Sequence, residues 1–102
     1  MSRNKPKTQT IQPQATSRFL KMVSVFDIKA QAFLSPQTVR TTAEGCRLFE
    51  NACADQNSNF FRFPSDFVLY ELAEWDELSG SIYPCKKPQT LATASDYVPQ
   101  KQ

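Results

Sequence analysis

Residues 41–53 read TTAEGCRLFENAC and carry the clearest secondary-structure signal in the chain. Thr41 and Glu44 have the spacing of a capping box, in which the threonine hydroxyl accepts a hydrogen bond from the third backbone N–H and the glutamate reaches back. Gly45, in the first turn, lowers the helix propensity. Small or apolar residues nevertheless recur at steps of three and four, which predicts one helix with a single buried stripe. These residues are Ala43, Cys46, Phe49, Ala52 and Cys53.

The segment before this helix, residues 19–28, reads FLKMVSVFDI and predicts a β-strand. Its apolar side chains fall on both faces, a pattern typical of a strand in the middle of a sheet. Residues 27–31 are expected to turn, and residues 32–34 to return as a short second strand before Pro36.

The segment after the helix predicts a hairpin. Residues 68–75 read VLYELAEW and favour a strand. Residues 76–80 are expected to form the loop because Gly80 can adopt a left-handed conformation. Residues 81–83 would return as a strand that ends at Pro84. The sequence therefore predicts an α+β domain over residues 19–84, a small antiparallel sheet of three to four strands with one helix packed on a face.

Both ends of the chain are polar. Residues 1–18 contain Ile11 as their one large branched apolar side chain and are expected to form a flexible basic arm. Residues 85–102 contain scattered Pro, Thr, Ser and Gln, which predicts a disordered, flexible tail. No apolar run resembles a membrane span or a signal peptide. Three cysteines without metal-knuckle spacing agree with a reducing compartment, so a cytoplasmic location is expected.

Charge is segregated along the chain although the net charge is only +2. Residues 1–21 carry five bases and no acid, whereas residues 22–80 carry nine acids against four bases. Residues 81–102 are again basic, with three lysines against one aspartate. The sequence thus predicts an acidic body between two basic ends.

Catalytic chemistry has little support in this sequence. Histidine, the commonest general base and neutral-pH metal ligand, is absent, and no glycine-rich phosphate loop is present. Cys85, beside two lysines, is the exposed candidate for a reactive thiol, whereas Cys46 and Cys53 lie on the expected buried stripe. We expect a protein that is not an enzyme and that has no catalytic residues, metal ligands or cofactor.

Nucleic-acid binding has more support. Flexible Lys and Arg side chains neutralise phosphates whatever the fold around them. Phenylalanines beside Arg62 resemble a platform that stacks unpaired bases, although the alternative is that Phe61 or Phe63 anchors this loop to the core. A solubilising tail is likewise the alternative for the arm. The predicted phosphate contacts are Arg3, Lys5, Lys7, Arg18, Lys21, Arg62, Lys86 and Lys87, and the candidate base-stacking residues are Phe60 and Phe61.

Four short segments together resemble the small nonstructural, DNA-associated protein of gokushovirus bacteriophages, in the Microviridae. They are residues 24–30 (SVFDIKA), 33–36 (FLSP), 64–72 (PSDFVLYEL) and 75–80 (WDELSG), and residues 42–49 match the helix of that family. Phe26, Trp75 and Ser79 depart from the Tyr, Phe and Thr usual there, and the basic arm is unusually long.

The resemblance implies a role in producing viral single-stranded DNA or packaging it into procapsids, in the host cytoplasm and without catalytic residues. The first hypothesis is therefore a DNA-binding accessory whose partner is the single-stranded viral genome. The second is a protein–protein adaptor that engages the replication initiator or the procapsid without touching DNA. An exposed sheet edge makes a homodimer plausible in either case, and an enzyme that depends on Cys85 is third.

Overall fold

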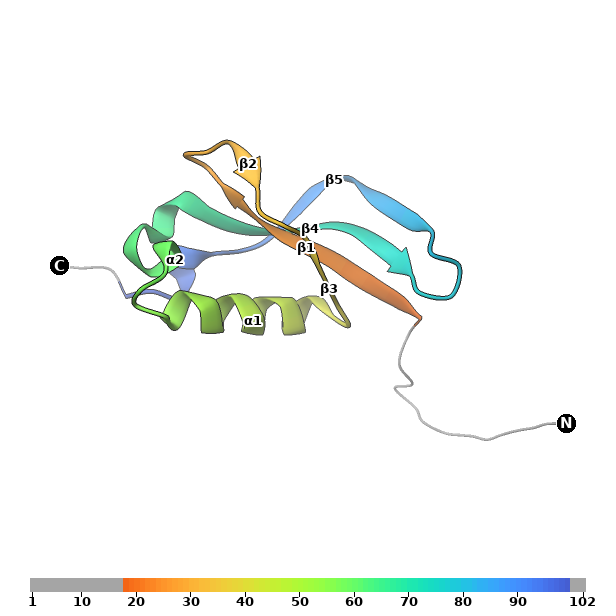
Figure 1. Cartoon of the computed structure of the whole chain (residues 1–102), viewed down its shortest axis with the longest axis horizontal. Helices are drawn as coiled ribbons and strands as arrows, with labels where there is room; N and C mark the ends of the chain where they lie inside the picture. The colour runs from red at the N-terminus through yellow and green to blue at the C-terminus, as the bar shows by residue number, and fades with distance from the viewer. Residues whose placement is uncertain (1–17, 100–102) are drawn as a thin grey trace, which may run out of the picture.

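Strand β1 (Phe19–Asp27) lies in the middle of an antiparallel sheet, as its apolar faces predict (Figure 1). The computed structural model describes residues 18–99, and in that part of the chain the sheet has five strands in the order β2-β1-β4-β5, with β3 also paired to β1. The other strands are β2 (Ala32–Phe33), β3 (Gln37–Val39), β4 (Phe67–Asp76) and β5 (Ile82–Thr93). The α+β class and the single main helix are confirmed.

Helix α1 (Thr42–Ala54) begins at the predicted cap. The Thr41 hydroxyl accepts from the Glu44 N–H at 3.1 Å, while the Glu44 carboxylate accepts from the N–H of Arg40, one residue before the cap, at 2.6 Å. Phe49 and Cys53 are buried as predicted. In the first turns the buried position is Gly45, whereas Ala43 is exposed.

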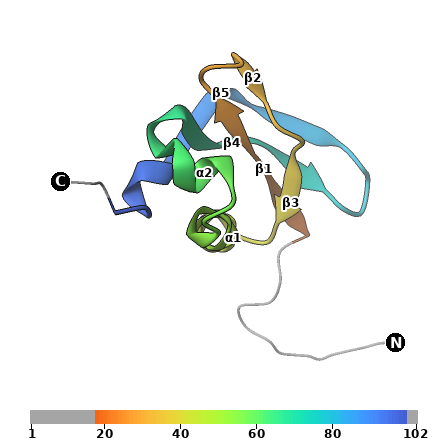
Figure 2. The same ribbon diagram turned by 60° about the vertical axis from the view of Figure 1, so that its left-hand side comes forward.

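The hydrophobic core lies between α1 and one face of the sheet (Figure 2). Val23 and Leu69 contribute from the central strands and Val39 from β3. Two short helical segments, α2 (Asn59–Arg62) and η1 (Pro64–Asp66), close one end of this core, because Phe60 and Phe61 pack against it. Within residues 18–99, no helix has the length and apolar character needed to cross a membrane.

The predicted flexible tail is wrong for residues 85–98. They continue β5 to Thr93 and then form η2 (Ala94–Asp96), and Ala92, Ala94 and Val98 are each 6% exposed or less. The polar composition misled the prediction because these residues are ordered by backbone pairing with β4, and small apolar side chains at a few positions are enough to close the core. The domain therefore extends past residue 84.

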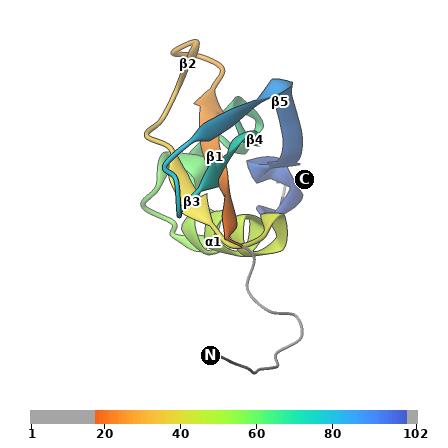
Figure 3. The same cartoon turned by 90° about the vertical axis from the view of Figure 1, so that its right-hand side faces the viewer.

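Strand β4 pairs irregularly with both of its neighbours. Its pairing with β1 shifts by one residue between Met22 and Val23. Its pairing with β5 shifts more, so that residues 85–88 lie opposite the single residue Leu72. Such bulges bend a strand. In Figures 1 and 3, β2 and the first half of β5 accordingly lie over the side of β1 and β4 that faces away from α1.

The β4–β5 hairpin confirms the predicted turn. Gly80 has φ 81°, the left-handed conformation expected of it, and its N–H donates to the carbonyl of Asp76 at 2.6 Å. This hairpin brings residues 85–88 onto the open face of the sheet.

Candidate nucleic-acid interface

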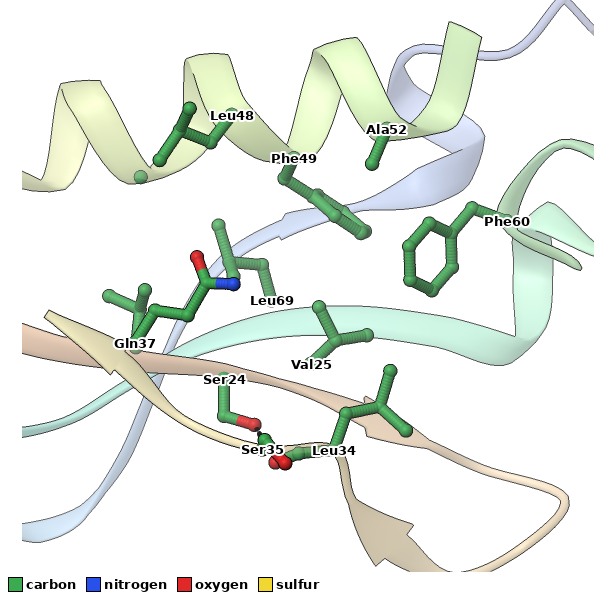
Figure 4. Close-up of a pocket in the computed structure, with 12 residues that line it drawn as sticks. Ser24, Val25, Leu34, Ser35, Gln37, Leu48, Phe49, Ala52, Phe60 and Leu69 are labelled. Atoms are coloured by element: carbon green, nitrogen blue, oxygen red, sulfur yellow. Dashed lines mark hydrogen bonds between the residues drawn. The ribbon is translucent and has the colours of Figure 1, made fainter. Parts of the chain in front are cut away.

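The sheet face opposite α1 carries a cluster of three aromatic rings, one from each of three strands. Val25 and Leu69 point toward α1 in Figure 4, so their neighbours in sequence, Phe26 and Tyr70, point to the opposite face. Phe33 of β2 completes the cluster. Its ring centroid lies 4.8 Å from that of Phe26 and 5.7 Å from that of Tyr70, and all the contacts are edge-to-face.

A hollow of about 270 Å³ opens beside this aromatic cluster. The three rings form part of its wall, and Lys87 and Pro88 of β5 form the rest. Lys86 and Lys87 are exposed, and neither makes an ion pair within residues 18–99. Aromatic faces next to free cations are what sequence-tolerant binding of single strands requires, since bases stack on the rings and phosphates lie near the ammonium groups.

The other predicted phosphate contacts on the body are of two kinds. Arg62 is exposed at the end of α2 and makes no ion pair among the described residues. It is not one of the residues that line the hollow beside the aromatic cluster. Arg18 and Lys21 are already paired with carboxylates. The predicted contacts Arg3, Lys5 and Lys7 lie outside the described residues.

Arg18 and Lys21 form ion pairs with acids of β4, and phosphate contact by these two side chains stays a prediction. The Arg18 guanidinium lies 2.9 Å from Asp76 and stands over the Phe19 ring, 5.0 Å from its centroid. The Lys21 ammonium lies 2.7 Å from Glu74 and 3.3 Å from Glu71. The hydrogen bond that the Lys21 ammonium donates to Glu74 is the main reason that the pKa of Lys21 is raised. The acids of β4 were known from the sequence, but only the strand register places them opposite these bases.

Asp76 anchors the start of the hairpin. Its side chain is 1% exposed, and its Oδ1 accepts the N–H of Leu78 at 3.0 Å while Oδ2 accepts from Arg18. Desolvation by itself would raise the pKa of this carboxyl. The hydrogen bonds from Leu78, Ser79 and Arg18 outweigh desolvation and hold the pKa of Asp76 below its usual value.

Phe60 and Phe61, the predicted base-stacking residues, belong to the core. The Phe60 ring meets Phe49 and Phe67 edge-to-face, with centroids 5.4 and 4.9 Å apart, and Phe61 packs against the same core. This packing agrees with the alternative that the loop is anchored to the core, because the short helix α2 turns these two side chains inward. Base stacking by Phe60 and Phe61 stays a prediction. Phe63 is the phenylalanine of residues 59–63 that faces solvent, at 54% exposure.

Sequence reasoning missed the aromatic cluster that the structure shows. The available signal was that Phe26 and Tyr70 alternate with Val25 and Leu69, which makes them outward-facing if the helix covers the valine side. The sequence does not say which side the helix covers. It gives no sign either that β2 and β5 bend over that face.

A second hollow lies on the helix side of the sheet, between α1 and residues 34–37 (Figure 4). It has a volume of about 460 Å³ and is bordered by Leu34 and Leu48, which are 43% and 46% exposed. Its lining is mainly apolar, with Ser24 and Gln37 among the polar members. We refer to it below as the helix groove.

The thiols of Cys53 and Cys85 are in surroundings that oppose ionisation. Burial raises the pKa of Cys53 to about 11, with a smaller contribution from Glu50. Burial also raises the pKa of Cys85, whose Sγ lies 4.0 Å from a Glu71 carboxylate oxygen. The charge of Lys21 acts in the opposite direction on Cys85 but does not reverse the shift. A raised pKa lowers the thiolate fraction, which is the reactive form.

Comparison with known proteins gives one match. A family model described as "Phage ORF5 protein" matches residues 20–97. No curated protein and no solved structure matches the chain. The matched segment runs from the second residue of β1 to the residue after η2, so it includes the sheet, α1 and the C-terminal segment that closes the core. The chain therefore belongs to the Phage ORF5 protein family, a family of bacteriophage proteins.

Proposed function

We propose that this protein binds single-stranded phage DNA on the open face of its sheet and so assists replication of the viral genome or its packaging into procapsids. The observation that carries the proposal is the meeting of Phe26, Phe33 and Tyr70 with Lys87 around one hollow. Membership of a phage family and the resemblance to the gokushovirus nonstructural protein support the viral setting. The proposed place of action is the host cytoplasm.

Binding would combine stacking with charge neutralisation. Unpaired bases can lie against the aromatic cluster, whereas the faces of bases in a duplex are covered by their neighbours. Lys86 and Lys87 would contact phosphates, and the basic residues 1–17 would add salt-dependent contacts. The exposed residues of α1 include two acids, Glu44 and Glu50, against one base, Arg47, so this surface attracts a phosphate backbone less than Lys86 and Lys87 do. This role needs no catalytic residue, metal or cofactor.

The test is a fluorescence anisotropy titration of labelled dT15 and of a duplex of equal length, at about 50 and 200 mM salt. Phe33→Thr should weaken single-strand binding about tenfold, since stacking is worth about 1–3 kcal/mol per base. Ile82→Thr is the matched control, because Ile82 is also an exposed apolar strand residue, at 54% against 41% for Phe33, and does not line the hollow.

The phosphate contacts have their own test in the same titration. A Lys86→Ala/Lys87→Ala double variant should lower the salt slope by about 1.4, and a chain without residues 1–17 should lower it further. Equal affinities for all variants, or preference for the duplex, would sink the proposal.

A protein–protein adaptor is the second candidate, and the helix groove is the observation that favours it. Its apolar border could receive a side chain of the replication initiator or of a procapsid protein. Pull-down of either protein by the body without residues 1–17, lost in Leu48→Ser, would support this role over DNA binding. Sedimentation of the free protein would report at the same time on the proposed homodimer.

A further inference from the structure

The β1–β2 turn, α2 and η1 lie at the same end of the sheet (Figure 1). Residues of these three segments line a third hollow. Its volume is about 390 Å³. Phe63 offers an aromatic ring that is 54% exposed, and Lys29 offers an ammonium group without an ion pair within residues 18–99. The rest of the lining is Asp27, Asn59, Asp66 and Phe67.

The walls of this hollow are fixed by backbone hydrogen bonds. The Ile28 N–H donates to the Asp66 carbonyl at 2.8 Å and so ties the turn to η1. The Phe63 N–H donates to the Asn59 carbonyl at 2.8 Å, which fixes the backbone that carries the exposed ring. Asp27 Oδ1 accepts from the Lys29 N–H at 3.0 Å. These bonds fix the backbone around the hollow, while the Phe63 ring and the Lys29 side chain are exposed to an entering ligand.

The chemistry of the lining fits one unpaired nucleotide. Phe63 can stack on a base and Lys29 can meet its phosphate. The Asp66 carboxylate makes no hydrogen bond or ion pair within residues 18–99. It can therefore accept a hydrogen bond from the exocyclic amine of a base. Cytosine carries such an amine at the position where thymine carries a carbonyl oxygen. A carboxylate therefore attracts cytosine and repels thymine, two bases of nearly equal size.

We propose that this hollow is a base-reading subsite that prefers cytosine to thymine. The inference rests on the proposed binding of single-stranded DNA and extends it. Phe26 lines one hollow and Asp27 the other, and consecutive strand residues point to opposite faces, so the two hollows lie on opposite sides of the end of β1. A single strand that passes around the β1–β2 turn would reach both hollows. Specificity would then come from the third hollow, and sequence-tolerant affinity from the aromatic cluster.

The test compares binding of dC15 and dT15 by the full chain. The unmodified protein should bind dC15 about tenfold more tightly, as expected for one hydrogen bond to a charged group. Asp66→Ala should abolish the preference by weakening dC15 binding while leaving dT15 binding unchanged or stronger. Phe63→Ser should weaken the binding of both. Glu50→Ala and Leu78→Ser are the matched controls, because they remove an exposed charge and an exposed apolar side chain elsewhere.

The outcomes separate this inference from the proposed function. Equal affinity for dC15 and dT15, both still weakened by Phe33→Thr, would overturn the base-reading subsite alone. No binding of either oligonucleotide would overturn both proposals. An arginine-rich peptide that binds in a Phe63-dependent manner, without any preference for dC15, would show that the hollow takes a basic protein segment and would overturn the subsite.

Discussion

Both faces of the sheet carry phenylalanine rings in edge-to-face contact, but the rings on the two faces have different surroundings. On the covered face, Phe49 and Phe60 meet edge-to-face between α1 and the sheet, and this packing leaves Phe49 only 4% exposed. On the open face, Phe26 and Phe33 meet with similar geometry but border a hollow next to a free lysine. Aromatic content alone therefore does not distinguish the two faces. The proposed binding on the open face rests on the side of the strand that the rings occupy and on the neighbouring charges.

The largest expected effect is on the covered face. Phe49→Ala should lower the free energy of unfolding by about 3–5 kcal/mol, because it leaves a cavity in the core. Phe33→Thr, on the open face, should cost about 1 kcal/mol or less, since Phe33 is 41% exposed. Urea unfolding followed by the fluorescence of Trp75, the single tryptophan, would measure both.

A second, milder variant at Phe49 is needed because a small domain has little stability to lose, and Phe49→Ala can unfold it completely. Phe49→Leu keeps most of the side-chain volume and should stay folded at a smaller cost than alanine. If Phe33→Thr proved as costly as Phe49→Ala, the open-face cluster would be a second core rather than a binding surface.

The next largest effect on the free energy of unfolding is expected at Asp76, in the hairpin that carries β5 onto the open face. The pKa of Asp76 is lowered in the folded chain, so its contribution to stability is present above its unfolded pKa of about 3.9 and is lost as the pH falls through the folded value. Unfolding free energy should therefore decrease in acid. Asp76→Asn should be less stable at neutral pH and show a flatter pH dependence below about pH 4.

Asp55→Asn is the control for this pH dependence. Asp55 is exposed, and its carboxylate accepts a local N–H from Asn57 at 2.9 Å. An identical acid profile for Asp76→Asn and the unmodified chain would mean that the buried carboxylate does not stabilise the hairpin.

Local signals in the sequence predicted the covered face well. The capping residue Thr41, the buried Phe49 and the left-handed Gly80 were each predicted from neighbours within a few positions. The features that the sequence did not predict depend on pairing between segments that are distant in sequence. The ion pair of Arg18 with Asp76 joins residues 58 positions apart, and residues 85–98 are ordered by pairing with β4 and by packing of Ala92, Ala94 and Val98 in the core. The aromatic cluster depends on pairing in the same way and was missed for that reason.

A smaller effect is expected at the tip of the hairpin. Gly80 has φ 81°, and nothing lies within 4 Å of where its side chain would be, so a substitution there changes the backbone energy alone. Gly80→Ala should lower the free energy of unfolding by about 1–2 kcal/mol. Gly80→Asn should cost less, because asparagine tolerates the left-handed region better. Equal losses for the two variants would indicate that the turn rearranges instead of straining.

The smallest effect, and the one of opposite sign, is expected at Gly45 on the covered face. A methyl group there would lie 3.5 Å from Val39 and 3.6 Å from Val23, which is ordinary van der Waals contact. Gly45→Ala should therefore raise the free energy of unfolding by up to about 1 kcal/mol, since alanine has the higher helix propensity. Gly45→Leu should instead destabilise the domain, because a longer side chain would push α1 away from β1 and β3. Loss of stability in Gly45→Ala would mean that α1 packs on the sheet more tightly than these distances indicate, whereas a gain together with unchanged DNA binding would show that the covered face can be strengthened without affecting the open one.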